Sequence, residues 1–371
     1  MLALLGLTAG TLAGSIFAQD RRQHLVPRNV DWDKVNKLIA VELALYLFSF
    51  IVAGRPLSAL WKLSGSTVYY TQTDTSTAIA LLDNMTLIAS GTLLATAAAR
   101  RRIYARPGSF ELAWLLILCL QTLGTGGRAR FYLVSIGWLI VQFGPALARP
   151  RPIARRATVL LASLGVLVLA VAFAEQLAVV RSRGIAQGSI ATRAVRDIDG
   201  LGTAEILFER GATPGVLGGR SYLELPALLL PRRFIGSGKP TPAADNLVRE
   251  RVDATSGLAA PLWIEPALNF GRAGVVVFCF LLTCAGGRLL TAARTASTRG
   301  MAAVGLLGPA WVLISFLVLS RLTILQCLSV VGAVSLGAVV AGRCLTWRPA
   351  PGAPGGHHAP TLVAASPGAT S

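Results

Sequence analysis

Long apolar windows separated by short charged loops run through most of the chain and limit the folds open to it. About nine windows approach the roughly 20 residues that a helix needs to cross the hydrocarbon core of a bilayer. We therefore expect an all-α polytopic membrane protein with about nine transmembrane helices. The windows lie near 1–18, 38–54, 77–98, 110–126, 130–148, 157–180, 267–287, 301–319 and 322–342.

Composition supports the same class. The 371 residues are 53% hydrophobic and only 14% charged, which is too apolar for a soluble domain of this length. The net charge of +18 would suggest nucleic acid only if the cations gathered on one soluble face, but they lie in short runs between the windows. The five cysteines show no metal or disulfide pattern, so they are interpreted as small apolar side chains, and neither a metal nor a cofactor is expected.

Short loops dense in arginine predict the orientation. Residues 100–106, 149–156 and 288–299 each carry several arginines, and the positive-inside rule places all three loops in the cytoplasm. With nine helices the three loops fall on one side, together with the C-terminus, and the chain starts outside. Window 1–18 lacks the basic residues that open a signal peptide, which favours a span whose start is cut short.

This topology divides the chain into four parts. Residues 1–180 hold about six helices, 181–262 form a large extracytoplasmic loop, 263–342 hold about three helices, and 343–371 form a cytoplasmic tail. The tail is rich in Pro, Gly, Ala and Ser, which predicts disorder. The large loop and the absence of an internal repeat argue against a transporter built of two matching halves.

Within the large loop, the segment 218–240 has a short apolar centre and basic ends. Its apolar run, Leu225 to Leu230, has a proline near each end and is too short to cross a bilayer. We expect a short interfacial or re-entrant helix in the outer leaflet, covered by protein or a polar cavity. Pro231 would end this helix and place Arg232 and Arg233 at headgroup depth.

Two further features place ionisable residues at the outer side. Arg128 and Arg130 fall in a short glycine-rich turn, which suggests contacts with an anion, or else snorkelling of the arginines to headgroups. Glu265 and Asn269 share one face of the helix after the loop, with Arg272 one turn beyond. A polar cavity would explain this face, and the alternative is that Glu265 caps the helix.

The remaining acidic residues carry weaker signals. Asp197 and Asp199 have D-x-D spacing, but a solvated turn or a carboxylate near the site is favoured over a metal ligand. No outer-face histidine is found, and no motif of a serine hydrolase, zinc protease or P-loop ATPase occurs. Four polar residues inside predicted spans are expected to hold the bundle together or line a lipid cavity: Glu42, Asp83, Asn84 and Glu111.

A spaced set of residues runs from the loop into the next window. It comprises a G-x-S-Y turn, an apolar stretch ending in P-R, a K-P pair and an E-x-x-x-N-F-G-x-x-G segment. These are Gly219, Ser221, Tyr222, Pro231, Arg232, Lys239, Pro240, Glu265, Asn269, Phe270, Gly271 and Gly274. Over about 120–290 the chain thereby resembles the O-antigen polymerase family, also called oligosaccharide repeat unit polymerases. It departs from the family pattern in the GSG before K-P and in its smaller number of spans.

The resemblance implies a membrane glycosyltransferase of the bacterial plasma membrane that builds a cell-surface polysaccharide. Such an enzyme moves a growing glycan from its polyprenyl diphosphate carrier to a sugar hydroxyl of a new carrier-linked repeat unit. Its implied partners are these carrier-linked glycans, membrane lipids, and flippase and chain-length regulator proteins, without nucleic acid.

The chemistry of this transfer suggests roles for the charged residues. The leaving diphosphate needs its charge stabilised, which arginine does through forked hydrogen bonds, and the acceptor hydroxyl benefits from a base. Glu265 is the candidate base, with Asp197 or Asp199 in reserve. Arg220 and Arg232 are assigned to catalysis by stabilising charge. The substrate-binding set is Arg128, Arg130, Tyr222, Arg233, Lys239, Asn269 and Arg272.

Three other functions stay open at this point. A related O-antigen ligase would transfer the finished glycan to another lipid, but ligases usually carry a histidine in the large loop, and 181–262 contains none. A carrier or flippase of lipid-linked sugars would need charged residues along a path through the whole bilayer. If the protein were a structural scaffold, glycan length would not depend on its charged residues.

Overall fold

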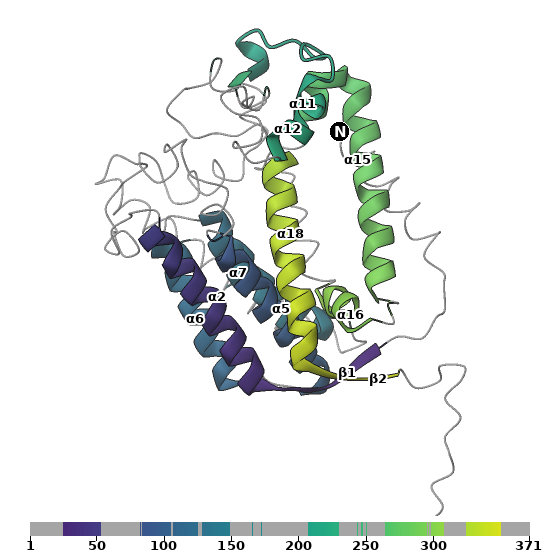
Figure 1. Ribbon diagram of the computed structural model, residues 1–371. Helices are drawn as coiled ribbons and strands as arrows, with labels where there is room; N and C mark the ends of the chain where they lie inside the picture. The colour runs from purple at the N-terminus through teal and green to yellow at the C-terminus, as the bar shows by residue number, and fades with distance from the viewer. Residues whose placement is uncertain are drawn as a thin grey trace, which may run out of the picture.

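The computed structural model describes residues 25–52, 84–104, 107–124, 128–148, 207–229, 264–294, 298–307 and 324–349, with single residues elsewhere. Helices dominate these ranges and form a bundle (Figure 1). Two short helices, α11 (Arg220–Leu223) and α12 (Leu225–Leu229), lie at one end of it. The other helices are α2 (Trp32–Val52), α5 (Met85–Ile103), α6 (Ser109–Gly124), α7 (Arg128–Ala148), α15 (Ile264–Arg294), α16 (Arg299–Leu306) and α18 (Ile324–Ala341).

The predicted windows within these ranges are helical, with shifted boundaries. Helix α2 begins at Trp32 rather than at 38, because Asp31 caps it: the amide of Lys34 donates to the Asp31 carboxylate (3.2 Å). Helix α5 extends past 98 and takes Arg100 into its last turn. The windows 1–18 and 157–180 lie almost wholly outside the described residues, and α16 covers only the first part of 301–319.

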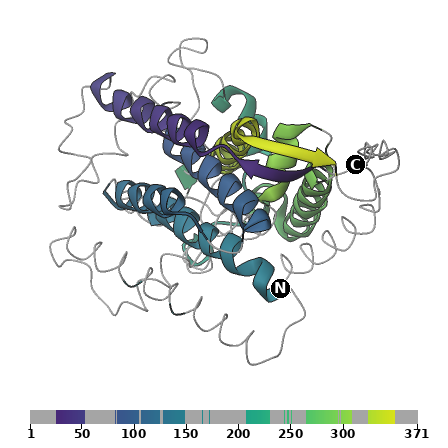
Figure 2. The ribbon, with the colours of Figure 1, turned by 90° about the horizontal axis from the view of Figure 1, so that it is seen from below.

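Two short strands depart from the all-α expectation. β1 (Leu25–Val30) and β2 (Leu345–Pro349) form an antiparallel pair at one end of the bundle (Figure 2). The pairing continues into the start of α2, since the amide of Asp31 donates to the carbonyl of Cys344 (2.9 Å). The first part of the predicted tail therefore has regular structure, as η3 (Gly342–Cys344) and β2, while 350–371 lies outside the described residues.

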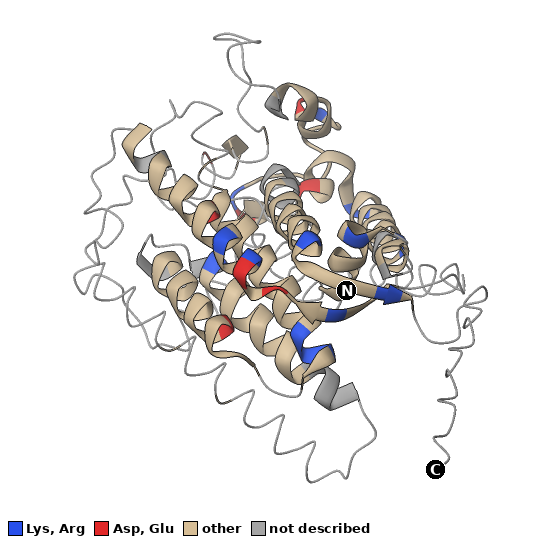
Figure 3. Cartoon of the chain, turned by 60° about the horizontal axis from the view of Figure 1, so that its bottom comes forward, with Lys and Arg blue, Asp and Glu red and all other residues tan. Residues whose placement is uncertain are grey.

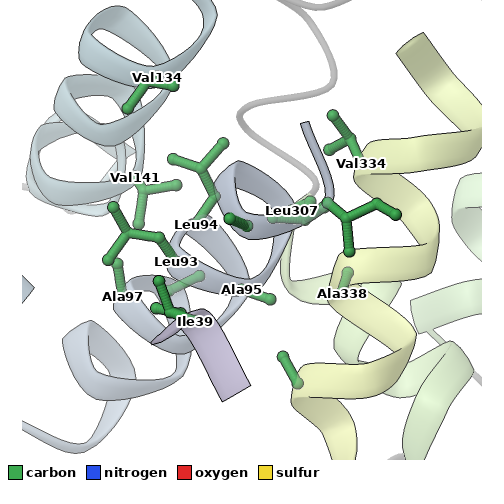
Figure 4. Packing of buried hydrophobic residues seen from close by; sticks show 14 of the residues in the cluster. Ile39, Leu93, Leu94, Ala95, Ala97, Val134, Val141, Leu307, Val334 and Ala338 are labelled. Carbon is green, nitrogen blue, oxygen red and sulfur yellow. The ribbon is translucent and has the colours of Figure 1, made fainter. Parts of the chain in front are cut away.

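Helix α5 lies at the centre of the bundle and contacts α2, α6, α7 and α18. Every residue from Thr86 to Ala99 is buried, and most of them are small. Figure 4 shows Leu93, Leu94 and Ala95 of this helix between side chains of α7 and α18. Small side chains allow helix backbones to approach closely, which is the packing typical of membrane helices.

The contact between α5 and α18 depends on glycine in both helices. A Cβ on Gly91 would overlap the backbone of Val334, and a Cβ on Gly337 would overlap the backbone of Ile88. Neither neighbour can yield, because both are main-chain atoms of a helix. These two positions therefore fix how near α5 and α18 lie.

The bundle has two different ends, called here the arginine-rich end and the loop end. At the first, the guanidinium of Arg100, near the end of α5, lies over the ring of Trp32 (5.5 Å), which also stacks on Phe110 at the start of α6 (6.3 Å). Strands β1 and β2 lie at this end, and Figure 3 turns it toward the viewer with its Lys and Arg in blue. At the loop end, α11 contacts α15 and α12 contacts α18.

Apolar side chains lie on the outside of the bundle as well as in its core, and several polar side chains are buried. Large apolar residues of α2, α6 and α15 are exposed, among them Phe48, Leu116 and Leu281. One described helix, Ile264–Ala293, is long and apolar enough to cross a membrane, and Ser109–Thr122, Arg130–Phe143 and Ser329–Cys344 are shorter apolar helices. The nine-span topology stays a prediction. The buried polar residues include Glu42, Thr86, Ser90, Thr92, Thr96, Glu111, Thr122 and Gln142.

The glycine contact makes a prediction for two substitutions in the same helix. Gly337→Ala should destabilise the protein by about 1–3 kcal/mol, since overpacking forces backbones apart. Gly332→Ala in α18 is the matched control, because a Cβ there meets nothing within 4 Å. Thermal unfolding of the purified protein in detergent would compare them, and equal melting temperatures would contradict the packing argument.

Candidate functional site

Helix α15 is broken near its start, at Gly271. Its backbone there is at φ 68° and ψ −159°, a conformation that essentially only glycine adopts. In an unbroken helix, the carbonyls of Ala267 and Leu268 would accept from the amides four residues on. Here they accept from the amides of Gly215 and Leu217 (2.9 Å each), in the predicted large loop. Two backbone acceptors just before the break thus hold the loop against α15.

Asn269 makes the main side-chain connection between the loop and α15. Its amide nitrogen donates to the hydroxyl of Ser221 (2.5 Å) and to the carbonyl of Glu265 (2.7 Å). Its side-chain oxygen accepts from the Ser221 amide (3.3 Å). Both residues are buried. Because both amide protons of Asn269 are used within the protein, the structure favours a positioning role for Asn269 over the predicted contact with substrate.

Aromatic rings complete the contact between the loop segment 215–224 and the start of α15, which is called the docked unit below. The ring of Tyr222 stacks on Phe270 with centroids 5.5 Å apart and planes at 11°, and lies 6.1 Å from the ring of Phe278 at a tilt. Gly219, with φ 89°, leaves room for this stack, since a Cβ there would lie 3.3 Å from the Phe270 ring. Two of the four motifs named in the sequence analysis, G-x-S-Y and E-x-x-x-N-F-G-x-x-G, therefore form one packed unit.

Tyr222 and Glu265 lie close together inside this unit. Glu265 is buried, with 3% exposure. Among the described residues, the Tyr222 hydroxyl is buried and has no hydrogen-bond partner. Burial, and to a lesser degree the Glu265 carboxyl group, raise the pKa of Tyr222, so the phenol stays protonated at physiological pH. A carboxyl group and a neutral phenol are thus neighbours in the packed contact between the loop and α15.

Arg220 lies at the surface of the unit. Its side chain is 73% exposed and its Nε donates to the carboxylate of Glu224 (2.7 Å), one turn further along the chain. The rest of the guanidinium faces outward. Glu224 was missed by the sequence analysis, although the spacing of four residues from Arg220 was a usable signal.

The other predicted site residues are placed differently. Arg272 is exposed, because the break at Gly271 interrupts the helical periodicity that would have set it beside Asn269. Arg128 and Arg130 belong to the first turn of α7 rather than to an open turn, and Arg130 is partly buried. Outside the described residues lie Asp197, Asp199, Arg232, Arg233 and Lys239.

Polar residues inside the bundle connect helices, one of the two roles expected for them. Glu111 accepts hydrogen bonds from the indole of Trp138 (2.6 Å) and the amide of Gln142 (2.5 Å), and lies 3.9 Å from Arg100. The side chain of Asn84 accepts from Ser329 of α18 (3.3 Å). Asp83 lies outside the described residues.

Comparisons with other proteins add no family to this geometry. The chain matches no protein-family model, no curated protein and no solved structure. In the part that the structure describes, no group of three or more His, Cys, Asp or Glu side chains could hold a metal ion. The function therefore has to be argued from the docked unit itself.

The broken helix makes a prediction for Gly271→Ala. Alanine at this φ and ψ is strained by about 1–3 kcal/mol, so α15 should straighten and move the carbonyls of Ala267 and Leu268 away from the loop amides. Hydrogen exchange at the amides of Gly215 and Leu217 should then accelerate, roughly tenfold for each 1.4 kcal/mol lost.

Gly286→Ala is the control for this experiment. Gly286 lies in the same helix, and a Cβ there meets nothing within 4 Å. Its exchange rates at Gly215 and Leu217 should match the wild type. Unchanged rates in Gly271→Ala would show that the loop does not depend on the break.

Proposed function

We propose that this protein polymerises polyprenyl-diphosphate-linked oligosaccharide repeat units, transferring the growing glycan to a carrier-linked acceptor sugar. One observation carries the proposal. The segments around Ser221 and Asn269, on which the family resemblance rests, are bonded to each other and stacked through Tyr222 and Phe270. A pairing of this kind is expected if both segments form a single site.

The distribution of side chains supports a membrane setting. Exposed apolar residues on α2, α6 and α15 and buried polar residues on α5 suit lipid as the surrounding solvent better than water. Helix α5 has 19 residues, which corresponds to about 28 Å at 1.5 Å per residue, close to the roughly 30 Å of a hydrocarbon core. The docked unit lies at the loop end of the bundle, away from the arginine-rich end that holds Arg100. This position agrees with an extracytoplasmic site.

The short helices of the loop suit an interfacial position. Leu223, at the end of α11, is 81% exposed, and Pro226 at the start of α12 is also exposed. Arg220 is exposed on the same short segment. An apolar surface beside an exposed guanidinium fits a lipid diphosphate, whose tail is apolar and whose head is anionic.

The start of α7 adds a second argument for an anion. A helix N-terminus carries a partial positive charge, so Arg128 and Arg130 in its first turn are unfavourable by themselves. A diphosphate bound at this end of the helix would offset the repulsion, because an anion interacts favourably with a helix N-terminus and with arginine.

Glu265 suits two roles in the transfer. As a general base it would accept the proton of the acceptor hydroxyl as the sugar attacks the anomeric carbon and the lipid diphosphate leaves. As a positioning residue it would keep the Tyr222 phenol neutral, because a nearby carboxylate raises the pKa of Tyr222. Its burial favours a role that begins only when substrate displaces part of the loop.

The Glu265→Gln variant tests this proposal in a reconstituted reaction. Two carrier-linked repeat units without an energy source should give longer glycans with the wild-type protein. Glu265→Gln should slow elongation by a factor of about 10²–10⁴ if the carboxylate acts as a base. Glu209→Gln, an exposed carboxylate of the same loop, should leave the rate unchanged.

Other products would identify the other functions. Transfer of a single block to a different lipid would indicate a ligase, and labelled carrier that only changes leaflet would indicate a flippase. Either product without longer glycans would overturn the polymerase proposal.

A second variant examines the charged segment after α12. Arg232→Ala should shorten the surface glycan in a deletion strain complemented with the variant, because one contact to the diphosphate is lost. Arg348→Ala, an exposed arginine on β2 at the opposite end, is the control. Unchanged glycan length in Arg232→Ala, with equal protein levels, would favour the scaffold alternative.

A further inference from the structure

Glu42 is a buried carboxyl group that the proposed transfer does not use. It lies near the middle of α2 (Trp32–Val52) and is only 4% exposed. Its Oε1 is 3.0 Å from the hydroxyl oxygen of Thr92, near the middle of α5. Carboxyl groups at such positions are costly to bury and are retained for a specific role.

The hydroxyl of Thr92 has more acceptors around it than it has protons. Besides Oε1 of Glu42, the carbonyl oxygens of Ile88 and Gly337 each lie 3.2 Å from it. A hydroxyl carries a single proton and can donate to only one of them at a time. At least one more proton is needed if Glu42 and Gly337 are both to be bonded to Thr92.

An ionised Glu42 leaves this site poorly satisfied. Thr92 would have to donate to Oε1, and the carbonyl of Gly337 would lose that donor. Oε2 of Glu42 is buried, and in the described part of the chain it has no hydrogen-bond partner. A buried carboxylate oxygen without a donor or a cation is strongly disfavoured.

No cation described in the structure compensates such a charge. A titratable neighbour of Glu42 is the Cys344 thiol of η3, which stays neutral because burial raises the pKa of Cys344. Lys34 and Asp31, which also act on Cys344, form a salt bridge with each other (2.8 Å). On α5 and α18 the groups that face Glu42 are a hydroxyl and a carbonyl.

We propose that Glu42 is a proton-binding site at the centre of the bundle. The protonated Oε1 donates to the hydroxyl of Thr92, and Thr92 donates in turn to the carbonyl of Gly337. Oε2 is then a neutral carbonyl oxygen, which is far cheaper to bury than a carboxylate. The bound proton thereby links α2, α5 and α18 in one directed chain of hydrogen bonds.

Glu111 provides an internal contrast. It is as deeply buried as Glu42, and its Oε2 likewise has no hydrogen-bond partner among the described residues. However, its Oε1 accepts from Trp138 and Gln142, and the cationic side chain of Arg100 lies 3.9 Å from its Oε2. These donors stabilise a carboxylate. A buried glutamate therefore binds a proton at position 42 and accepts hydrogen bonds as a carboxylate at position 111.

Infrared spectra of the full-length wild-type protein and of its variants, recorded in detergent at neutral pH and subtracted from one another, test the proposal. The carbonyl stretch of a protonated carboxyl group lies above the amide and carboxylate bands. Glu42→Gln should remove such a band from the wild-type spectrum. Thr92→Val, which keeps the shape of the side chain but not its hydroxyl, should keep the band and move it to higher frequency because the hydrogen bond is lost.

Three results would overturn the proposal. The first is a wild-type spectrum without a protonated carboxyl band. The second is loss of the band in Glu111→Gln but not in Glu42→Gln. The third is a band whose frequency stays unchanged in Thr92→Val. The Thr92→Val comparison also decides the matter if Glu42→Gln fails to fold, since specific labelling of glutamate carboxyl groups identifies the band without that variant.

Discussion

The close approach of α5 and α18 is the contact on which the rest of the bundle depends. Gly91 and Gly337 let two helix backbones meet without intervening side chains, and this brings the carbonyl of Gly337 within reach of Thr92. Larger residues at either glycine would separate the helices and leave that carbonyl beyond hydrogen-bond distance. Helix α5 also contacts α2, α6, α7 and α16, so its position sets theirs.

A second constraint acts at the loop end, where helix α15 is broken at Gly271. Gly271 breaks the helix just after Ala267 and Leu268, whose carbonyls accept from amides of the loop. Buried backbone groups need hydrogen-bond partners, and at this point the loop and α15 supply them to each other.

The sequence predicted the helical class and most helix positions within the described residues, because these depend on local apolar periods. Its motifs also singled out Ser221, Tyr222 and Asn269 of the docked unit, but not the loop amides of Gly215 and Leu217. It missed β1 and β2. These strands pair residues from nearly opposite ends of the chain, such as Leu25 and Pro349, and neither strand has a local pattern that predicts this pairing. It placed Arg272 beside Asn269 because regular helix geometry was assumed through Gly271. It gave Asn269 a role in substrate binding because the partner of its amide, Ser221, lies far away in sequence.

Two of the buried glutamates show why residue type alone does not settle chemistry. Glu42 and Glu111 are both buried in apolar helices, and the sequence offers no means of separating them. Their difference arises from what the neighbouring helices supply: α7 brings Trp138 and Gln142 to Glu111, whereas α18 brings an acceptor, the Gly337 carbonyl, to the partner of Glu42. A surplus of donors favours the carboxylate, and a surplus of acceptors favours the acid. Because Gly337 both sets the helix spacing and supplies that acceptor, packing and protonation at the bundle centre are controlled by the same residue.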